Sequence, residues 1–159
     1  MKQFSLNILI LCSMLMSVMA SAQDSATVKQ TGGVDHIGLS VSDLDASTDF
    51  FVDVLGFKVS GRDTKYPATF MNNGEMSLTL WQTDDDNVKF NRKRNVGLHH
   101  LAISVTSFDA LDSLYQAAKE TPGVVIEFSP ELAYGGPSKH MMIREPSGNR
   151  LELVHRPNR

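Results

Sequence analysis

Hydrophobic and polar residues alternate along this chain in short runs, and the same run occurs twice. The stretch 33–41 (GVDHIGLSV) and the stretch 97–105 (GLHHLAISV) match almost residue for residue. In each stretch apolar residues occupy every second position, which predicts a strand that buries one face and lines the other with small residues. A histidine stands at the same place in both, His36 in the first and His100 in the second. The chain therefore contains one structural module twice.

The same order of elements follows both strands. The first is followed by apolar residues at helical spacing up to Gly56, and the second by a similar stripe that stops at Pro122 and Gly123. The first copy is predicted to contain a strand over 34–41, a helix capped by Asp43 or Asp45, and strands over 57–62, 68–71 and 77–82. The second is predicted to contain a strand over 98–105, a helix with apolar residues from 108 to 118, strands over 124–128, 139–144 and 151–155, and a loop over 129–137. This is an α+β protein of two βαβββ modules, which pair because each sheet alone would leave one face uncovered.

The N-terminus has a different character. Residues 1–22 comprise Lys2, an apolar run over 8–19 and small residues up to Ala22, which predicts a secretory signal peptide cleaved after Ala22. The run is too short to span a bilayer. Residues 23–32 are polar and predicted to form a flexible leader. We therefore expect a secreted or periplasmic protein with no membrane contact after cleavage.

The remaining residues, 33–156, are predicted to form one domain: module one over 33–83, a linker over 84–96 and module two over 97–156. The formal net charge of the chain is only −3. The linker contains a basic cluster, 92–94, close to an acidic run, 84–86. Both signs are present and no aromatic residues alternate with them, so we favour a solvated linker over an anion site and expect no nucleic-acid binding.

Four motifs carry a resemblance to a known family: VDHIGLSV, VLGFKV, LHHLAISV and REPSGNRLELV. With them the chain resembles the vicinal oxygen chelate superfamily, which includes glyoxalase I, bleomycin-resistance proteins and extradiol dioxygenases. The resemblance covers residues 34–154. It implies that the sheets of the two modules curl into a mixed-sheet cup around a divalent metal ion. The linker is long enough for the cup to close within one chain or by exchange between two chains of a homodimer, and the sequence favours neither.

The resemblance also implies a set of metal ligands on the first and last strands of each module. His36, His100 and Glu152 match three of these positions, and Thr79 stands at the fourth, where glyoxalase I-like and epimerase-like members carry Glu or Gln. Threonine is a poor ligand for the usual metals. Two imidazoles and one carboxylate bind Fe(II), Mn(II) or Zn(II) and leave positions open for water, oxygen or substrate. The sequence therefore predicts a divalent-metal site of unknown metal identity.

Further residues are candidates for catalysis and substrate binding. His140 lies on the predicted strand before Glu152 and is a candidate acid or base near neutral pH, the alternative being an ordinary solvent-exposed histidine. Extradiol and fosfomycin-resistance enzymes resemble each other in having a Tyr ten residues before the final Glu, and this chain has Met142 there. The candidate pocket residues are Thr79, Trp81, Tyr134, Met142 and Arg144.

These observations predict a secreted metal-dependent enzyme that acts on a small substrate with vicinal oxygens. A ring-cleaving or other dioxygenase is favoured by elimination, because export and Thr79 both disfavour the first alternative, a glyoxalase I-like lyase or isomerase. The second alternative is a metal-free small-molecule binding protein of the bleomycin-resistance type, which sequesters an antibiotic.

Overall fold

The computed structural model describes residues 31–84 and 89–157, and Val34–Arg159 forms one compact unit. The predicted signal peptide lies outside the described residues, as does all of the predicted leader except residues 31 and 32. Within the described ranges, no helix has the length and apolar character needed to cross a membrane.

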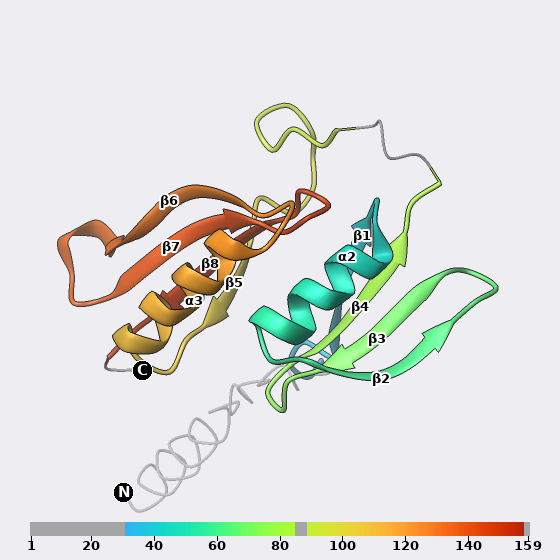
Figure 1. Cartoon of the computed structure of the whole chain (residues 1–159), viewed down its shortest axis with the longest axis horizontal. Helices are drawn as coiled ribbons and strands as arrows, with labels where there is room; N and C mark the ends of the chain where they lie inside the picture. The colour runs from blue at the N-terminus through green and yellow to red at the C-terminus, as the bar shows by residue number, and fades with distance from the viewer. Residues whose placement is uncertain (1–30, 85–88, 158–159) are drawn as a thin grey trace, which may run out of the picture. The chain divides into compact units, whose positions relative to one another are not determined.

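Two modules of the same construction follow one another along the chain (Figure 1). Module one consists of β1 (His36–Val41), α2 (Leu44–Asp49), the π-helical turn η1 (Phe50–Val54), β2 (Lys58–Asp63), β3 (Ala68–Asn72) and β4 (Ser77–Gln82). Module two consists of β5 (Leu101–Ser104), α3 (Phe108–Glu120), β6 (Val125–Leu132), the 3₁₀ turn η2 (Ala133–Gly135), β7 (Lys139–Arg144) and β8 (Arg150–His155). The predicted α+β fold of two βαβββ modules is confirmed.

The two sheets share one topology and one register. Their strand orders are β1-β4-β3-β2 and β5-β8-β7-β6, with the first pair parallel and the others antiparallel. Gly38 pairs with Thr79, and Ala102 pairs with Glu152. Because Gly38 and Ala102 are equivalent in the sequence repeat, Thr79 occupies in module one the position that Glu152 occupies in module two.

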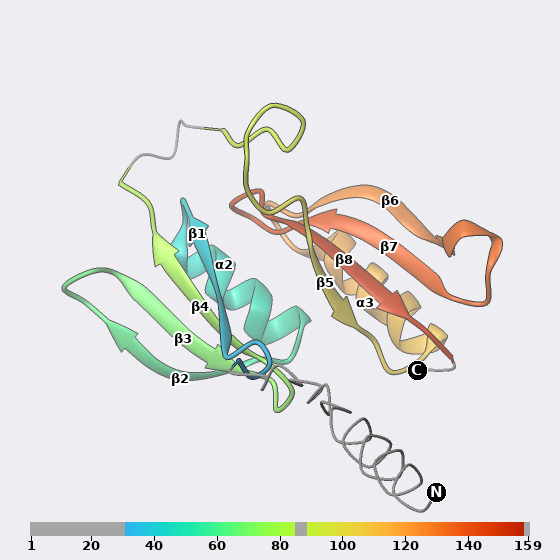
Figure 2. The same cartoon turned by 180° about the vertical axis from the view of Figure 1, so that it is seen from behind.

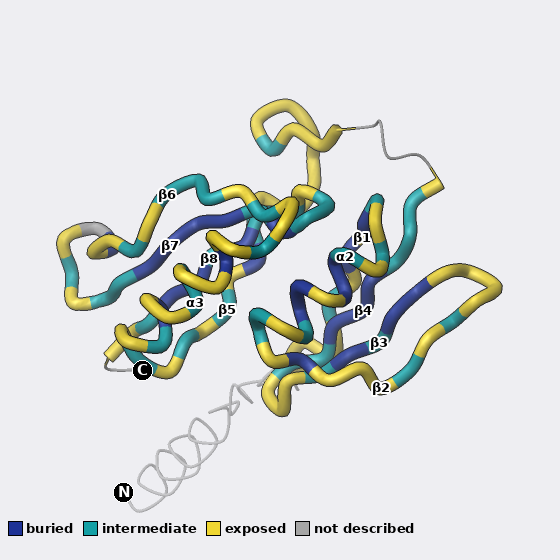
Figure 3. The backbone as a smooth tube through the Cα atoms, in the orientation of Figure 1, coloured by how far each residue is buried: buried dark blue, intermediate teal, exposed yellow. Residues whose placement is uncertain are grey.

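Each sheet has one face covered by the helix of its own module. Helix α2 contacts β3 and β4, and α3 contacts β6, β7 and β8. Figure 2 shows the other side of each sheet, which none of the described helices covers and which we call the open face. Along β1, Leu39 and Val41 are buried and the intervening Gly38 and Ser40 are exposed, as the alternation predicted (Figure 3). The helix-covered faces hold the core, and the open faces carry the candidate functional residues.

Three local predictions differ from the structure. Strand β5 begins at Leu101, so His100 lies immediately before the strand. Strand β6 continues to Leu132 through part of the predicted loop, because register shifts between Phe128 and Glu131 leave room for Pro130, which cannot donate to a ladder. The π-helical turn, in which the Leu55 N–H donates to the Phe50 carbonyl at 3.4 Å, has no distinct signature in the apolar spacing.

The turn between β7 and β8 is organised around a fully buried carboxylate, that of Glu145 (0% exposed). Its Oε2 accepts hydrogen bonds from the Ser47 hydroxyl at 2.6 Å and from the Ser147 N–H at 3.0 Å. Its Oε1 accepts from the Asn149 N–H at 2.8 Å and from Asn149 Nδ2 at 2.9 Å. Four donors therefore replace the water that burial removes from this charge.

The same turn also binds the backbone of module one. The Ser147 hydroxyl oxygen accepts from the N–H groups of Ser42 and Asp43, both at 3.1 Å, and Asn149 Nδ2 donates to the Ser40 carbonyl at 2.9 Å. Asp43 is the N-cap of α2, and Ser47, the partner of Glu145, lies within that helix. Residues 145–149 therefore join module two to the β1–α2 connection of module one. We call residues 145–149 the clasp turn, and their hydrogen bonds the clasp.

We predict that Glu145→Gln lowers the free energy of unfolding by about 2 to 4 kcal/mol, because the amide turns one oxygen into a donor that faces other donors. Urea denaturation followed by circular dichroism measures this. Glu131→Gln, which changes an exposed carboxylate on β6, is the matched control and should change stability by less than about 0.5 kcal/mol. Equal effects of the two substitutions would contradict a specific role for the buried carboxylate.

Candidate functional site

His100 and Glu152 lie together in module two. His100 precedes β5, Glu152 projects from the neighbouring β8, and the distance from His100 Nε2 to Glu152 Oε2 is 3.3 Å. Nitrogen and oxygen ligands lie about 2.0–2.2 Å from a metal such as zinc, so two ligands of one ion are about 3 Å apart. Both side chains retain some exposure, 33% for His100 and 12% for Glu152. This pair fits the first two ligands of a divalent metal.

His140 supports the same carboxylate from β7. Its Nδ1 lies 2.5 Å from Glu152 Oε1, and its ring lies against that of Phe128 with 5.0 Å between centroids. Because an ionised carboxylate only accepts hydrogen bonds, the Nδ1 atom carries the hydrogen in this pair. His140 is buried, so the alternative of a solvent-exposed strand histidine is wrong. Its bond orients Glu152 as groups around metal ligands do.

His36, the third predicted ligand, lies apart from this pair. It stands exposed at the start of β1, and its Nδ1 lies 2.6 Å from Asp35 Oδ1. Among the residues that the structure describes, no three His, Cys, Asp or Glu side chains are gathered so that they could hold one ion. The pair fits a metal, whereas the complete set of His36, His100 and Glu152 stays a prediction.

Thr79 and Trp81 belong to an aromatic hollow on the open face of module one. Thr79 is buried and its Oγ1 accepts a hydrogen bond from Trp81 Nε1 at 2.9 Å. The Trp81 ring lies 5.0 Å from that of Tyr66 and 5.8 Å from that of Phe70, centroid to centroid. A Cβ atom at Gly38 would lie 3.3 Å from Thr79 Oγ1 and 3.5 Å from Trp81 Nε1. The hollow has a volume of about 300 Å³ and also includes His36.

The remaining predicted pocket residues lie in module two. Met142 is buried on β7 and pairs in register with Glu152, so an apolar thioether stands beside the carboxylate. Arg144, at the end of the same strand, is half-buried and binds Glu127. The backbone of Tyr134 lies in η2, and its side chain is outside the described part of the structure.

An arginine cluster, which the sequence analysis did not identify, surrounds Glu127 on β6. Arg150 Nε lies 2.6 Å from Glu127 Oε2, and Arg144 Nη2 lies 2.6 Å from Glu127 Oε1. Arg92 Nη1 approaches Oε1 at 3.8 Å, so this linker residue is not simply solvated. Arg144 and Arg150 pair in register on either side of the clasp turn. Their placement at equal distances from this turn is the sequence feature that could have indicated that the two arginines lie together.

Charge in this region shifts two ionisable groups. Burial acts to raise the pKa of Glu127, but the hydrogen bond and charge of Arg150, followed by those of Arg144, outweigh it and hold that pKa below its usual value. His99 is exposed, and its Nδ1 lies 2.8 Å from His100 Nδ1. Partial desolvation, followed by the charge of Arg150, lowers the pKa of His99.

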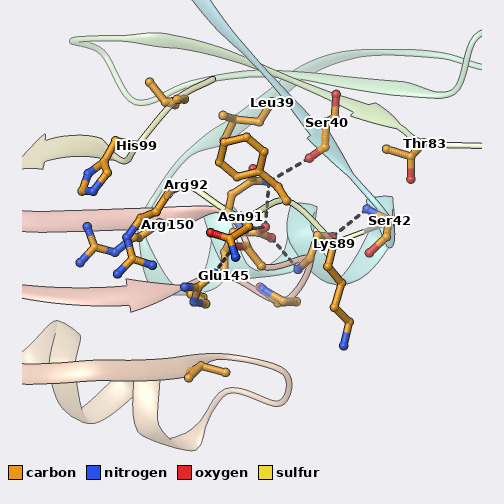
Figure 4. Close-up of a pocket in the computed structure, with 18 of the residues that line it drawn as sticks. Leu39, Ser40, Ser42, Thr83, Lys89, Asn91, Arg92, His99, Glu145 and Arg150 are labelled. Carbon is orange, nitrogen blue, oxygen red and sulfur yellow. Dashed lines mark hydrogen bonds between the residues drawn. The ribbon is translucent and has the colours of Figure 1, made fainter. Parts of the chain in front are cut away.

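A cavity of about 850 Å³ adjoins the arginine cluster (Figure 4). Its lining comes from the first strand, the linker and the clasp turn, and includes Arg92, His99, Arg144 and Arg150. In Figure 4 the Arg92 and Arg150 side chains extend into the same region as the His99 ring. His99, which lines the cavity, also contacts His100, one member of the His100–Glu152 pair.

Comparisons with known proteins identify relatives across both modules. The family model described as Glyoxalase/Bleomycin resistance protein/Dioxygenase superfamily matches residues 33–153. A 2-epi-5-epi-valiolone epimerase of Actinomyces sp. is 27% identical over 148 residues, 78% of this chain and 79% of that protein. The mitochondrial methylmalonyl-CoA epimerase of Mus musculus is 29% identical over 96 residues, 55% of this chain and only 54% of that enzyme.

Solved structures show the same fold. The glyoxylase/bleomycin resistance protein/dioxygenase domain from Frankia sp. superposes with a TM-score of 0.69 at 25% identity, covering 81% of this chain and 96% of that one. The family resemblance predicted from the four sequence motifs is confirmed.

We predict that Glu127→Gln destabilises the protein by about 1 to 3 kcal/mol at pH 7, because three guanidinium groups lose their shared counter-charge. The lowered pKa of Glu127 gives the pH dependence its sign: the ionised carboxylate stabilises the fold above its unfolded pKa, near 4.5, and this contribution is lost as the pH falls through the lower folded value. Urea unfolding of both proteins at pH 7, 5 and 4 should show the difference shrinking at the acid end. A difference that stays constant over this range would contradict the assignment.

Proposed function

Because the chain belongs to the glyoxalase/bleomycin resistance protein/dioxygenase superfamily, we propose that it is a metal-dependent enzyme acting on a small substrate through two neighbouring oxygen atoms. The observation that carries the proposal is the 3.3 Å distance between His100 Nε2 and Glu152 Oε2 on the open face of module two. His100 and Glu152 would hold the ion, and His36 would complete the donor set. When bound, a divalent ion supplies positive charge that polarises substrate oxygens.

The reaction that the described groups support best is proton transfer next to a carbonyl group. His140, whose Nδ1 lies 2.5 Å from Glu152 Oε1, is the group we propose as the acid or base of this step. In this mechanism His140 removes the proton from the carbon beside the carbonyl, the electron pair of the C–H bond becomes a C=C bond, and the carbonyl π pair moves to the oxygen. The reverse electron shift takes a proton from water at the opposite face of the same carbon, which gives the epimer, and His140 releases its proton to water. The names of two relatives, both epimerases, support this class of reaction.

A ring-cleaving dioxygenase is the second candidate. The predicted set of two histidines and one carboxylate favours it, since this set is typical of non-haem Fe(II) oxygenases. Met142 argues against it, because its thioether offers no proton donor or acceptor beside Glu152.

The proposal includes a homodimer. The described residues of one chain do not bring His36 to the His100–Glu152 pair, and a second copy can supply it. A secreted or periplasmic location is also proposed, on the pattern of residues 1–22 alone.

We expect the purified protein to bind one Mn²⁺ ion per chain. Glu152→Gln and His100→Gln should each weaken binding by about 100-fold, because each removes a ligand. Isothermal titration calorimetry measures this, with Glu131→Gln as the control that keeps wild-type affinity. Absence of Mn²⁺ binding, or wild-type affinity in Glu152→Gln, would favour the metal-free binding protein.

Mixing two variants that each lack one proposed metal ligand tests whether His36 binds the ion of its own chain or that of a second copy. If two copies share a site, mixing His36→Gln chains with Glu152→Gln chains produces dimers with one complete site. We therefore expect tight Mn²⁺ binding to return to about one site per mixed dimer. Recovery of no site would contradict a site shared between two copies.

The proposed role of His140 is tested with dihydroxyacetone and its phosphate, which carry neighbouring oxygens beside an exchangeable C–H bond. We expect the Mn²⁺-loaded protein to exchange this hydrogen for solvent deuterium, as measured by NMR. His140→Gln should keep Mn²⁺ affinity, because an amide still donates to Glu152, but should lower exchange by about 100-fold. Oxygen consumption with catechol by the Fe(II)-loaded protein, without any exchange, would favour the dioxygenase instead.

A further inference from the structure

We propose that the arginine cluster of Arg92, Arg144 and Arg150 is a binding site for an anionic group, a carboxylate or a phosphate, carried by a small molecule. The cluster lies outside the predicted metal ligands and within reach of the 850 Å³ cavity.

The first argument is an imbalance of charge. Three guanidinium groups share the carboxylate of Glu127, which leaves a surplus of two positive charges. The side chains of Arg150, Arg92 and Arg144 are only 13%, 26% and 33% exposed. Partly desolvated charges of one sign repel each other and cost free energy unless counter-charge approaches them. An anion that enters the cavity supplies that counter-charge.

The second argument is the composition of the cavity wall. Among the described residues that line it, five are cations, Lys89, Arg92, Lys93, Arg144 and Arg150, and one is an acid, Glu145. The four hydrogen bonds of the clasp already engage the Glu145 carboxylate. The wall therefore presents positive charge to whatever occupies the cavity.

The third argument is the chemistry of the guanidinium group. Its planar fork of N–H donors matches the paired oxygens of carboxylates and phosphates, and the resulting charge-assisted hydrogen bonds are about twice as strong as neutral ones. Glu127 holds Arg144 and Arg150 through one nitrogen each, Nη2 and Nε, and Arg144 Nη1 also donates to the Gly148 carbonyl at 3.4 Å. The cluster is thus positioned by Glu127 and has further donors with which to bind a second anion.

The position of the cluster indicates what the anion belongs to. Arg150 and Glu152 are two residues apart on β8, so they share the open face at a spacing of about 7 Å. A molecule whose anionic group binds the cluster can therefore extend to the His100–Glu152 pair. Assigning the anion to the substrate rests on the proposed function, whereas binding of the anion does not.

The test is calorimetric titration of the metal-free full-length protein with inorganic phosphate and, separately, with malonate at low ionic strength. We expect saturable binding of at least one probe, and the preferred probe distinguishes a phosphate from a carboxylate site. Arg150→Gln and Arg144→Gln should each weaken binding by about tenfold or more. Arg62→Gln, which removes an exposed arginine of module one, is the matched control and should bind as the wild type does.

Glu127→Gln separates a binding role from a merely structural one. Removing the internal carboxylate leaves three guanidinium groups without counter-charge, so the preferred probe at saturation should raise the melting temperature of this variant more than that of the wild type. No saturable binding of either probe, equal weakening by Arg62→Gln, or unchanged binding in both Arg144→Gln and Arg150→Gln would overturn the proposal. Mn²⁺ binding is measured in the absence of phosphate and malonate. A failure of anion binding therefore does not affect the test of the metal site.

Discussion

A buried negative charge holds this protein together at the point where its two modules meet. The Glu145 carboxylate is removed from water, and its hydrogen bonds reach both the turn that contains it and the helix of the other module. A charge in such surroundings tolerates no missing donor, so it fixes Ser147 and Asn149, which in turn bind the backbone where β1 leads into α2. Arg144 and Arg150 flank this turn. The geometry of the arginine cluster therefore depends on a carboxylate that takes no part in it.

Alternation along the strands separates stability from chemistry. On β8, Leu151 and Leu153 are completely buried toward α3, whereas Arg150 and Glu152 point to the open face. The same strand thus contributes to the core and to the candidate site, with little overlap between the two sets of residues. This explains how the open faces of the two modules can differ, one aromatic and one charged, while their cores and registers remain alike.

The sequence predicted the features that depend on neighbouring residues. The alternation around His36 and His100 identified the repeat, because strand faces are a local property. The sequence also marked the limits of the first helical segment, with Asp43 or Asp45 as its cap and Gly56 at its end, and Asp43 is the cap in the structure. The meeting of Arg92, Glu127 and Arg150 could not be predicted in this way, since the three residues are distant in sequence and come together only in the folded chain. The bond between His140 and Glu152 likewise requires β7 and β8 to pair in one particular register. Whether a linker arginine is solvated or half-buried is a tertiary property that composition does not encode.

The register equivalence of Thr79 and Glu152 has an evolutionary consequence. After an internal duplication, each copy of a module inherits the same position for a ligand, and one copy can lose that ligand as long as the other retains it. In module one the position holds a hydroxyl that accepts a hydrogen bond from the Trp81 indole, so this half presents an aromatic surface where module two presents a carboxylate. Because the surrounding ladder is unchanged, a substitution at this one position can alter the number of ligands without altering the fold. Duplicated modules of this kind can therefore diversify in chemistry one strand position at a time.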